Sequence, residues 1–313
     1  MLVSVVIPTH NPNASRLEAT LEALCAQNFP ERSWELIVVN NASSNWLSDE
    51  FVATRAPANL QIIQELNLGL SFARQSGILA SNGSVVVLSD DDNVLAPDYL
   101  EQVVSSFDRD PGLGMTGGKS IPIYAQTPPD WFVEGMAPLG CRDLGDRPLV
   151  MTGDEFRKSR SYPLFAPIGA GMAFRKSAVN SWMASVGKSG ISDRKGNLLS
   201  SAGDCDMVLH ALSSGWNVSY QPKLSLQHLI PAERLAARYL ANISRCATRD
   251  FIRVLAIHGI VPWEPMPSWT LPFRKLKAWV KCRPWSSNGA LIDFNSRLGH
   301  YEARATLRSA KSV

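Results

Sequence analysis

Three short apolar runs, each followed by polar residues, alternate with helical patterns in the first third of this chain. Residues 15–27 place leucines on one face of a helix, with Ser15 as the expected N-cap, and residues 67–80 predict a loop that leads into a second helix. Strands that alternate with helices predict right-handed βαβ units, and therefore an α/β fold with a mostly parallel sheet flanked by helices. The expected strands, rich in β-branched residues, span 2–7, 35–39 and 84–88.

Polar residues follow each of these expected strands. Parallel strands end at the same edge of a sheet, and ligands of such sheets bind in the crevice outside the carboxyl ends. We therefore expect the three polar clusters to line one crevice. They are Pro8 to Asn11, Asn40 to Ser43 and Asp90 to Asp92.

The third cluster is a run of three adjacent carboxylates, in the sequence VVVLSDDDN. Carboxylates this close repel one another unless a cation lies among them. Mg²⁺ and Mn²⁺ bind carboxylate oxygens together with substrate phosphates, and Asp90 and Asp92 can approach one such ion if the loop turns here. The alternative is a solvated acidic turn or a helix cap before Pro97.

Two carboxylates and one histidine farther along the chain are candidates for chemistry. Asp204 and Asp206 stand in the Gly-flanked stretch SAGDCDMVLHAL, which opens a helix. Asp206 is interpreted as a cap or a partner of the helix dipole, worth roughly 1 kcal/mol. Asp204, on the loop side, is better placed to act as a general base. His228 is a candidate metal ligand, although a single histidine is more often structural, so both interpretations stay open.

The start of the second expected helix is a candidate anion site. Gly69, Leu70 and Ser71 predict a turn into that helix, and Arg74 is either a phosphate partner or an exposed surface arginine. The chain has no GxGxxG after its first strand, no P-loop and no GxSxG elbow. These absences argue against a dinucleotide site, a P-loop phosphate site and an α/β-hydrolase.

Composition and charge limit the class of protein. Of 313 residues, 45% are hydrophobic and 19% charged, as expected of a globular chain with a sizeable core. A net charge of +3, without a dominant basic block in the first two-thirds, gives no indication of nucleic-acid binding. Five scattered cysteines without a CxxC pair favour a reducing compartment. The short N-terminal apolar run predicts neither a signal peptide nor a membrane span.

The composition of the sequence changes twice after the acidic cluster. Residues 119–166 are rich in Pro and Gly and are expected to form an irregular insertion or mobile loop, after which 206–213 predict a helix and 216–220 a strand. From about residue 232 the sequence is basic, helical and Trp-containing. We therefore predict a domain of residues 1–231 and a mainly helical C-terminal extension of residues 232–313.

Taken in order, these segments resemble the inverting family 2 glycosyltransferases of the GT-A fold. The order and spacing of the matches are more specific than any single one, and they cover residues 1 to about 230. The resemblance implies a GT-A type, Rossmann-like sheet. The matching segments are SVVIPTHN (4–11), WELIVVNNASS (34–44), NLGLSFARQSGI (67–78), VVVLSDDDNVLAPDYL (85–100), GAGMAFRKSAV (169–179), and AGDCDMVLHALSSGW with QPKLSLQH (202–228).

The resemblance implies roles for the acidic residues and for His228. Asp204 matches the catalytic base, and Asp92 and His228 match the metal ligands. Asp90 lies toward the ribose and the metal-bound phosphate. Asp91 is counted with the nucleotide-sugar-binding residues, although we expect it to face away as a bystander.

The resemblance also assigns the remaining nucleotide-sugar site. Two positions depart from the family pattern. Asn40 stands where an Asp usually reads the base, and Gly203 stands where an acidic residue usually precedes the catalytic base. An amide both donates and accepts hydrogen bonds, so Asn40 remains able to recognise a base. The other residues assigned to this site are Pro8, Thr9, Asn11, Arg74 and Gly171.

The implied activity is transfer of a sugar, with inversion, from a nucleotide diphosphate sugar to an acceptor hydroxyl, in polysaccharide or glycoconjugate biosynthesis. UDP is the expected nucleotide, Mn²⁺ or Mg²⁺ the expected cofactor, and a saccharide or lipid-linked saccharide the expected acceptor. Residues 119–166 would close over the donor and exclude water. A retaining transferase, a metal-dependent sugar nucleotidyltransferase and a non-catalytic nucleotide-sugar-binding module remain alternatives.

The segment PSWTLPFRKLKAWVKCRPW (267–285) mixes Trp and Leu with basic residues. It is interpreted either as an interfacial helix or as an amphipathic helix packed on the catalytic domain with a basic solvent face, and the second is preferred. We expect a cytoplasmic protein. If the first interpretation holds, this tail makes peripheral contact with the inner face of the membrane.

Overall fold

The computed structural model describes residues 2–188, 194 and 199–307 of the chain. The chain divides into two compact units, each made of three segments. The second unit contains two internal segments in addition to the C-terminal one. The predicted domain of residues 1–231 included these two internal segments. The first unit comprises Met1–Ile123, Gly140–Gly190 and Asp204–Leu229, and the second Tyr124–Leu139, Ile191–Gly203 and Ile230–Val313.

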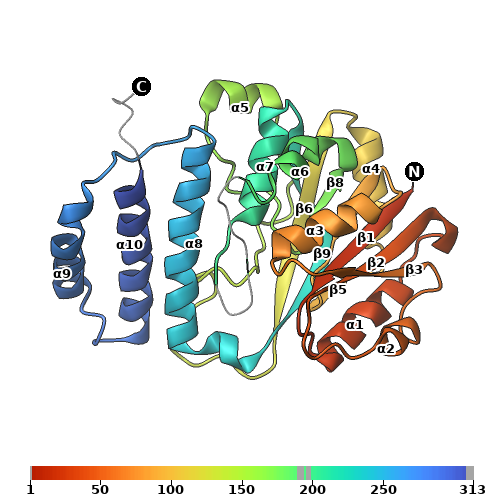
Figure 1. The fold of residues 1–313 in the computed structure, drawn as a ribbon, viewed down its shortest axis with the longest axis horizontal. Coiled ribbons are helices and arrows are strands. Elements are labelled where there is room, and N and C mark those ends of the chain that lie inside the picture. The colour runs from red at the N-terminus through yellow and green to blue at the C-terminus, as the bar shows by residue number, and fades with distance from the viewer. Residues whose placement is uncertain (1, 189–193, 195–198, 308–313) are drawn as a thin grey trace. The chain divides into compact units, whose positions relative to one another are not determined.

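A single sheet organises the first unit (Figure 1). Its strands, within the described part of the chain, are β1 (Val3–Thr9), β2 (Trp34–Asn41), β3 (Leu60–Glu65), β4 (Val85–Leu88), β5 (Asn93–Leu95), β6 (Leu113–Tyr124), β7 (Leu149–Met151), β8 (Ala173–Arg175) and β9 (Asn217–Ile230). They are ordered β3-β2-β1-β4-β8-β6-β9-β5, with β7 paired to β9. The strands β3, β2, β1 and β4 run parallel, whereas β8 runs antiparallel to β4 and β6, and β5 and β7 run antiparallel to β9.

The helices complete an α/β fold, which confirms the predicted fold class. Several of them follow a parallel strand and return the chain to the start of the next, as βαβ connections do. Their bounds are α1 (Ala14–Cys25), α2 (Asp49–Ala53), α3 (Leu70–Ala80), α4 (Tyr99–Arg109), α5 (Gly153–Ser159), α6 (Asn180–Ser185), α7 (Gly203–Ser213), α8 (Ala237–Ile257), α9 (Leu271–Cys282) and α10 (Asn288–Thr306).

Helices α1 and α3 cover opposite faces of the parallel strands (Figure 1). On α1 the leucines at 17, 21 and 24 are buried in a core with alternate residues of β1 and β2. On the other face, Gly77 of α3 lies directly against Val6 of β1 and Val39 of β2. Because both faces are covered, every residue of β1 is buried, which explains its continuous apolar run.

This close approach of α3 to the sheet makes Gly77→Ala a test of the packing. A Cβ at residue 77 would collide with Val6 and lie 3.1 Å from a methyl group of Val39. Overpacking of this kind costs typically about 1–3 kcal/mol, so we expect the free energy of unfolding in urea to fall by about 2 kcal/mol. Gly289→Ala, on α10 with open space around it, is the matched control and should leave the stability unchanged or raise it. Equal effects of the two substitutions would contradict the packing argument.

The structure differs from the sequence prediction in three elements of the first unit. Asn13, not Ser15, caps α1, because its side chain accepts a hydrogen bond from the amide of Arg16. The strand β3 was not predicted. The segment 119–166, expected to be irregular, contains the end of β6, strand β7 and helix α5, whose N-terminus is closed by a capping box of Thr152 and Glu155.

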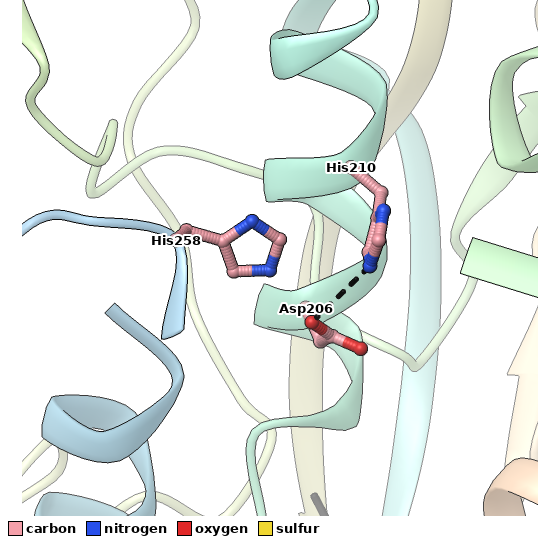
Figure 2. A group of neighbouring side chains, drawn as sticks. All are labelled: Asp206, His210 and His258. Atoms are coloured by element: carbon pink, nitrogen blue, oxygen red, sulfur yellow. Dashed lines mark ion pairs between the residues drawn. The ribbon is translucent and has the colours of Figure 1, made fainter. Parts of the chain in front are cut away.

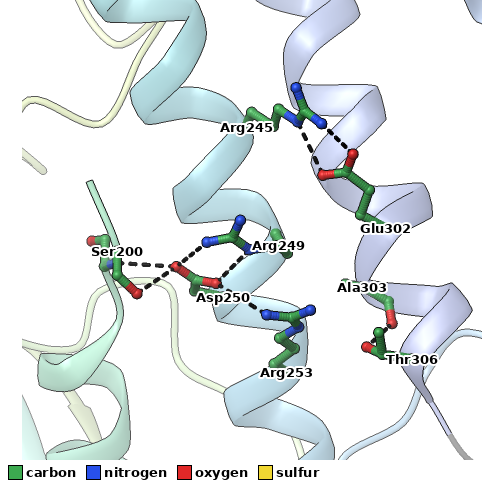
Figure 3. A network of polar contacts seen from close by, with 9 residues as sticks. Ser200, Arg245, Arg249, Asp250, Arg253, Glu302, Ala303 and Thr306 are labelled. Atoms are coloured by element: carbon green, nitrogen blue, oxygen red, sulfur yellow. Dashed lines mark hydrogen bonds and ion pairs between the residues drawn. The ribbon is translucent and has the colours of Figure 1, made fainter. Parts of the chain in front are cut away.

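In the second unit, α8 and α10 lie side by side. A Cβ on Gly299 of α10 would collide with the carbonyl of Arg245 on α8, so the glycine permits the close contact. Figure 3 shows the polar contacts that accompany this packing. Arg245 forms an ion pair with Glu302 across the two helices, and Asp250 accepts hydrogen bonds from Ser200 and Arg249. Among the helices that the structure describes, none is both long and apolar enough to cross a membrane.

Glu302 makes the stability of this helix pair depend on pH. Burial raises the pKa of this carboxyl, but hydrogen bonds from Arg245 and Lys275 outweigh burial and hold the pKa below its ordinary value of 4.5. A depressed pKa contributes stability above pH 4.5 that is lost as the pH falls through the folded-state pKa. We expect Glu302→Gln to lower the free energy of unfolding by roughly 1–2 kcal/mol at pH 7, with a much smaller effect near pH 3. Equal losses at both pH values, or none beyond that of the exposed control Glu233→Gln, would contradict this account.

Candidate functional site

The carboxyl ends of β1 and β2 lie next to each other, as the sequence predicts. Thr9 and Asn40 are register partners on these parallel strands, and both are buried. The Asn40 side-chain oxygen accepts a hydrogen bond from the amide of Ser43 and closes the turn that follows β2. Asn11 accepts one from the amide of Ser44 and so ties the loop after β1 to the loop after β2. The predicted residues Pro8, Thr9, Asn11 and Asn40 thus belong to one connected group.

Asn41, the neighbour of Asn40, holds the start of α3 against this edge of the sheet. Its amide group donates hydrogen bonds to the carbonyls of Glu65 and Asn67, and its oxygen accepts one from the amide of Gly69. All the polar atoms of its side chain are thereby used within the protein. Asn41 is a positioning residue for the loop that precedes α3, a role that the sequence analysis did not assign.

The acidic triplet forms a tight turn between β4 and β5. The amide of Asn93 donates to the carbonyl of Asp90, and the amide of Asp90 donates to the side chain of Asn93. Asp91 accepts a hydrogen bond from the Thr9 hydroxyl, so it points to the end of β1. The expectation that Asp91 faces away from the site is therefore wrong. Asp92 points to the other side, toward β9.

Burial and the neighbouring carboxylates disfavour the charged form of Asp91. Burial, followed by the negative charges of Asp92 and Asp90, raises the pKa of Asp91 to about 7, against the hydrogen bond from Thr9, which lowers it. A carboxyl with this pKa is only partly ionised at neutral pH. A cation beside Asp92 would offset the negative charge that acts on Asp91, so the electrostatics of the turn fit a cation site on that side.

Asp92 and His228, the two predicted metal ligands, are brought together. His228 on β9 pairs in register with Asn93, and its Nε2 lies 3.3 Å from Oδ1 of Asp92. Both side chains are buried. Burial opposes a charged ring, but the hydrogen bond with Asp92 and the contact with Cys141 outweigh it and raise the pKa of His228 to about 10. The Sγ atom of Cys141 lies 3.7 Å from Nδ1 of the same ring; no motif in the sequence indicated this neighbour.

Arg74 and Asp204 both lie next to Gly169. The amide of Gly169 donates a hydrogen bond of 3.1 Å to Asp204, and a Cβ on Gly169 would collide with the guanidinium of Arg74. Arg74 is buried, so the interpretation as an exposed surface arginine is wrong. Asp204 is the second residue of α7 and so belongs to the helix rather than to the preceding loop. Its side chain also accepts a hydrogen bond from the amide of Cys205.

Residues from the segment 119–166 complete the surroundings of Asp204. Burial lowers the pKa of Arg142 below its ordinary value. The nearby carboxylate of Asp204 acts in the opposite direction, with a smaller effect. Burial and the neighbouring Cys205 and Asp204 keep the pKa of Tyr162 well above its ordinary range. Arg142 follows Cys141 in the chain, so it connects the surroundings of His228 with those of Asp204. Pattern and spacing gave no signal for Arg142 or Tyr162.

Gly171 and Asp206 have roles in the framework around these groups. Gly171 has a positive φ of 73°, and its carbonyl accepts a hydrogen bond from the hydroxyl of Tyr99. Asp206 lies in the first turn of α7, as predicted, but it is also buried and forms an ion pair of 3.7 Å with His210 one turn later (Figure 2). His210 in turn contacts the hydroxyl of Ser181. Asp206 therefore stabilises α7 through its pairing with His210.

Several of the curated proteins similar to this chain are named as glycosyltransferases. A glucosyl-dolichyl phosphate glucuronosyltransferase of Haloferax volcanii is 29% identical over 150 residues, which are 46% of this chain and 47% of that protein. An N-acetylglucosaminyltransferase of Azorhizobium caulinodans is 23% identical over 234 residues, which are 73% of this chain and 55% of that protein. The chain spans about half the length of these two relatives.

The fold and the sequence profile agree on one family. The structure of S. aureus TarS 1-349 in complex with UDP-GlcNAc matches with a TM-score of 0.53 over 95% of this chain and 84% of that chain. At 16% identity this match shows a shared fold. The profile of the family described as glycosyl transferase family 2 matches residues 4–182, more than half of the chain and including the acidic turn. The chain therefore belongs to glycosyl transferase family 2.

Proposed function

We propose that this chain is an inverting glycosyltransferase that moves a sugar from a nucleotide diphosphate sugar, with UDP as the nucleotide, to an acceptor hydroxyl. The observation that carries the proposal is that Asp204 and Arg74 both lie next to Gly169, in the same unit as the acidic turn. A base and a cation placed together suit a reaction that removes a proton from one group and leaves negative charge on another. The family and the two relatives support the same reaction class.

The nucleotide-sugar donor is assigned to the crevice at the carboxyl ends of β1, β2 and β4. Pro8, Thr9, Asn11 and Asn40 would surround the nucleoside, where the Asn40 amide recognises the base. Arg74 would pair with the diphosphate, since a guanidinium binds phosphate oxygens in a bidentate manner. Asp90 and Asp91 would lie toward the ribose and phosphates, and the backbone of Gly171 toward the donor sugar.

A divalent cation fits the donor set at the acidic turn. Asp92 and His228 would bind it, and their side chains already lie within 3.3 Å of each other. The imidazole nitrogen favours Mn²⁺ over Mg²⁺, because Mg²⁺ prefers oxygen ligands. When bound, the cation neutralises charge that develops on the departing diphosphate.

The residues of the chain would perform a single displacement. Asp204 takes the proton from the acceptor hydroxyl, whose oxygen forms a bond to the anomeric carbon while the bond to the diphosphate breaks on the opposite face. Arg74 stabilises the leaving group, and the Gly169 amide keeps the Asp204 carboxylate in place. Residues 140–166, which supply Cys141, Arg142 and Tyr162, would limit the access of water to this reaction.

The acceptor is proposed to be a saccharide or a lipid-linked saccharide in polysaccharide or glycoconjugate biosynthesis, because one relative is named for a dolichyl-phosphate-linked substrate. We place the reaction on the cytoplasmic side, at the inner face of a membrane. The five cysteines, all within the described part of the chain, are thiols rather than disulfides, which suits a reducing compartment.

A two-step experiment tests the proposed function. Thermal shifts with a panel of nucleotide sugars, with and without Mn²⁺, identify the donor, and UDP-sugars are expected to give the largest shift in the presence of Mn²⁺. Proton NMR of slow donor hydrolysis then shows which anomer is released before mutarotation. An α-linked donor should release the β sugar. Release of the α sugar would indicate a retaining enzyme. Formation of pyrophosphate would indicate a nucleotidyltransferase, and a thermal shift without turnover would indicate a binding module.

A further inference from the structure

Helix α9 of the second unit exposes its large apolar side chains. This contradicts the preferred interpretation from the sequence, in which the apolar side was covered and only a basic face met solvent. Among the residues of α9, only Ala278 is buried. The exposed fractions are 68% for Phe273, 60% for Leu276, 58% for Val280 and 47% for Trp279, with Trp269 at 72% just before the helix and Trp285 at 61% just after it.

The exposed residues form one continuous face. Phe273, Leu276 and Val280 are spaced by three and four residues, so they lie in one row along the helix, which we call the apolar face of α9. Lys277 and Lys281 directly follow Leu276 and Val280 in the sequence. They form a second row of exposed residues beside the apolar face. The face thus has a basic border along its length.

Helix α9 is attached to its unit from the side opposite the apolar face. Lys275 forms an ion pair of 2.7 Å with Glu302 of α10, and Ala278 is buried. These two residues lie on the helix side opposite Val280. The helix is therefore held in place while its apolar face points to solvent.

The charges next to the apolar face indicate the chemistry of its partner. Within the described part of the chain, no carboxylate lies within the 4.0 Å ion-pair distance of Lys277, Lys281 or Arg274. Three basic side chains without acidic neighbours attract an anionic surface. Trp279 and Trp285, with ring centroids 4.5 Å apart, add the aromatic side chains that prefer the boundary between water and lipid.

We propose that α9, with Trp269 and Trp285, binds the surface of an anionic membrane, with its apolar face among the lipid headgroups and acyl chains. The combination of Phe, Leu and Trp on one side of a helix with Lys and Arg at its border is the pattern of helices that lie in the plane of a membrane interface. A protein partner would need a groove of matching shape and acidic charge, whereas a lipid surface needs only the negative charge and apolar depth found in any anionic bilayer. The proposal does not depend on the donor or on the reaction at the acidic turn.

Co-sedimentation of the full chain with vesicles tests the proposal. Binding is expected to vesicles that contain phosphatidylglycerol and to be much weaker with phosphatidylcholine alone, and to decrease as salt is added. Each Lys or Arg near an anionic surface changes the partition coefficient by about fivefold. Lys277→Glu with Lys281→Glu should therefore weaken binding by at least about 25-fold, and Phe273→Ser with Leu276→Ser should weaken it to a similar extent.

Matched controls come from exposed residues elsewhere in the chain. Leu79→Ser removes a side chain that is 68% exposed on α3, as exposed as Phe273, and Arg109→Glu reverses an exposed charge at the end of α4. Both should bind vesicles like the unaltered chain. Unfolding midpoints and donor-induced thermal shifts of all variants should stay the same, which separates this test from that of the proposed function. The proposal would be overturned if the controls lost as much vesicle binding as the α9 variants, or if neutral vesicles were bound as well as anionic ones. It would also be overturned if the chain formed a dimer that the substitutions Phe273→Ser and Leu276→Ser dissociate.

Discussion

Replacing Asp204 with asparagine is expected to lower kcat for sugar transfer by about 10²–10⁴-fold, while the donor still binds. An amide cannot take the proton of the acceptor hydroxyl at neutral pH. The amides of Gly169 and Cys205 donate hydrogen bonds to separate oxygens of Asp204, and the single oxygen of asparagine can accept one of the two. We therefore expect the first turn of α7 to form as before, with the loss of one hydrogen bond. The measurements are initial rates of transfer and the donor-induced thermal shift of the same preparation.

Asp206→Asn is the matched control for this prediction. It removes a carboxylate from the same turn of α7, but one that is buried and paired with His210. We expect it to lower stability and to retain most of kcat at a temperature where the variant is folded. Full transfer by Asp204→Asn would exclude Asp204 as the base. Loss of donor binding together with transfer would instead assign it a structural role.

Asp92→Asn is expected to have the second largest effect. The side chain would lose the charge that holds a cation, whereas its shape and its contact with Asn93 are kept. A cation that neutralises the leaving diphosphate is worth several kcal/mol, so we expect kcat to fall by about 10²–10³-fold. The Mn²⁺ concentration for half-maximal activity should rise at least about tenfold, as should the Kd for Mn²⁺ in a direct titration of the protein.

Two further variants make the metal assignment specific. His228→Gln should also weaken Mn²⁺ binding, because Nε2 of the ring lies next to Asp92. Asp108→Asn, on the exposed side of α4, should leave both Mn²⁺ binding and kcat unchanged. Unaltered Mn²⁺ binding by Asp92→Asn and His228→Gln would contradict the proposed site. Weaker binding without any change in kcat would mean that the cation has no part in the reaction.

The residues that could be predicted from the sequence are those that stand at the ends of regular elements. Asn40 lies at the end of β2, Asp92 in the turn after β4, and Asp204 in the first turn of α7, so periodicity alone places each of them near the end of an element. His228 was a candidate metal ligand from the sequence alone, with a structural role as the alternative, and its position in the family pattern favoured the ligand. Its contact with Asp92 depends on the pairing of β5 with β9, two strands more than a hundred residues apart in sequence.

Side chains that come from irregular segments could not be predicted. Cys141 and Arg142 reach the site because Arg142 forms an isolated bridge with Ser120 at the end of β6, which no local pattern indicates. The strand β3 was missed because none of its residues is fully buried and glutamines flank its two isoleucines. Helix α9 was expected where it lies, but periodicity cannot tell whether an apolar face is covered by the rest of the chain.

The division of the chain into two units has a consequence for engineering. The chain passes between the units five times, after residues 123, 139, 190, 203 and 229. Contacts within the second unit join these separate segments, as when the amide of Ala125 donates to the carbonyl of Ile230, or Ser200 donates to Asp250 on α8. A deletion that begins at residue 230 would leave Ala125 and Ser200 without these partners. The C-terminal helices are therefore not an exchangeable module, and transplanting them onto another family member would require the two internal segments to be moved with them.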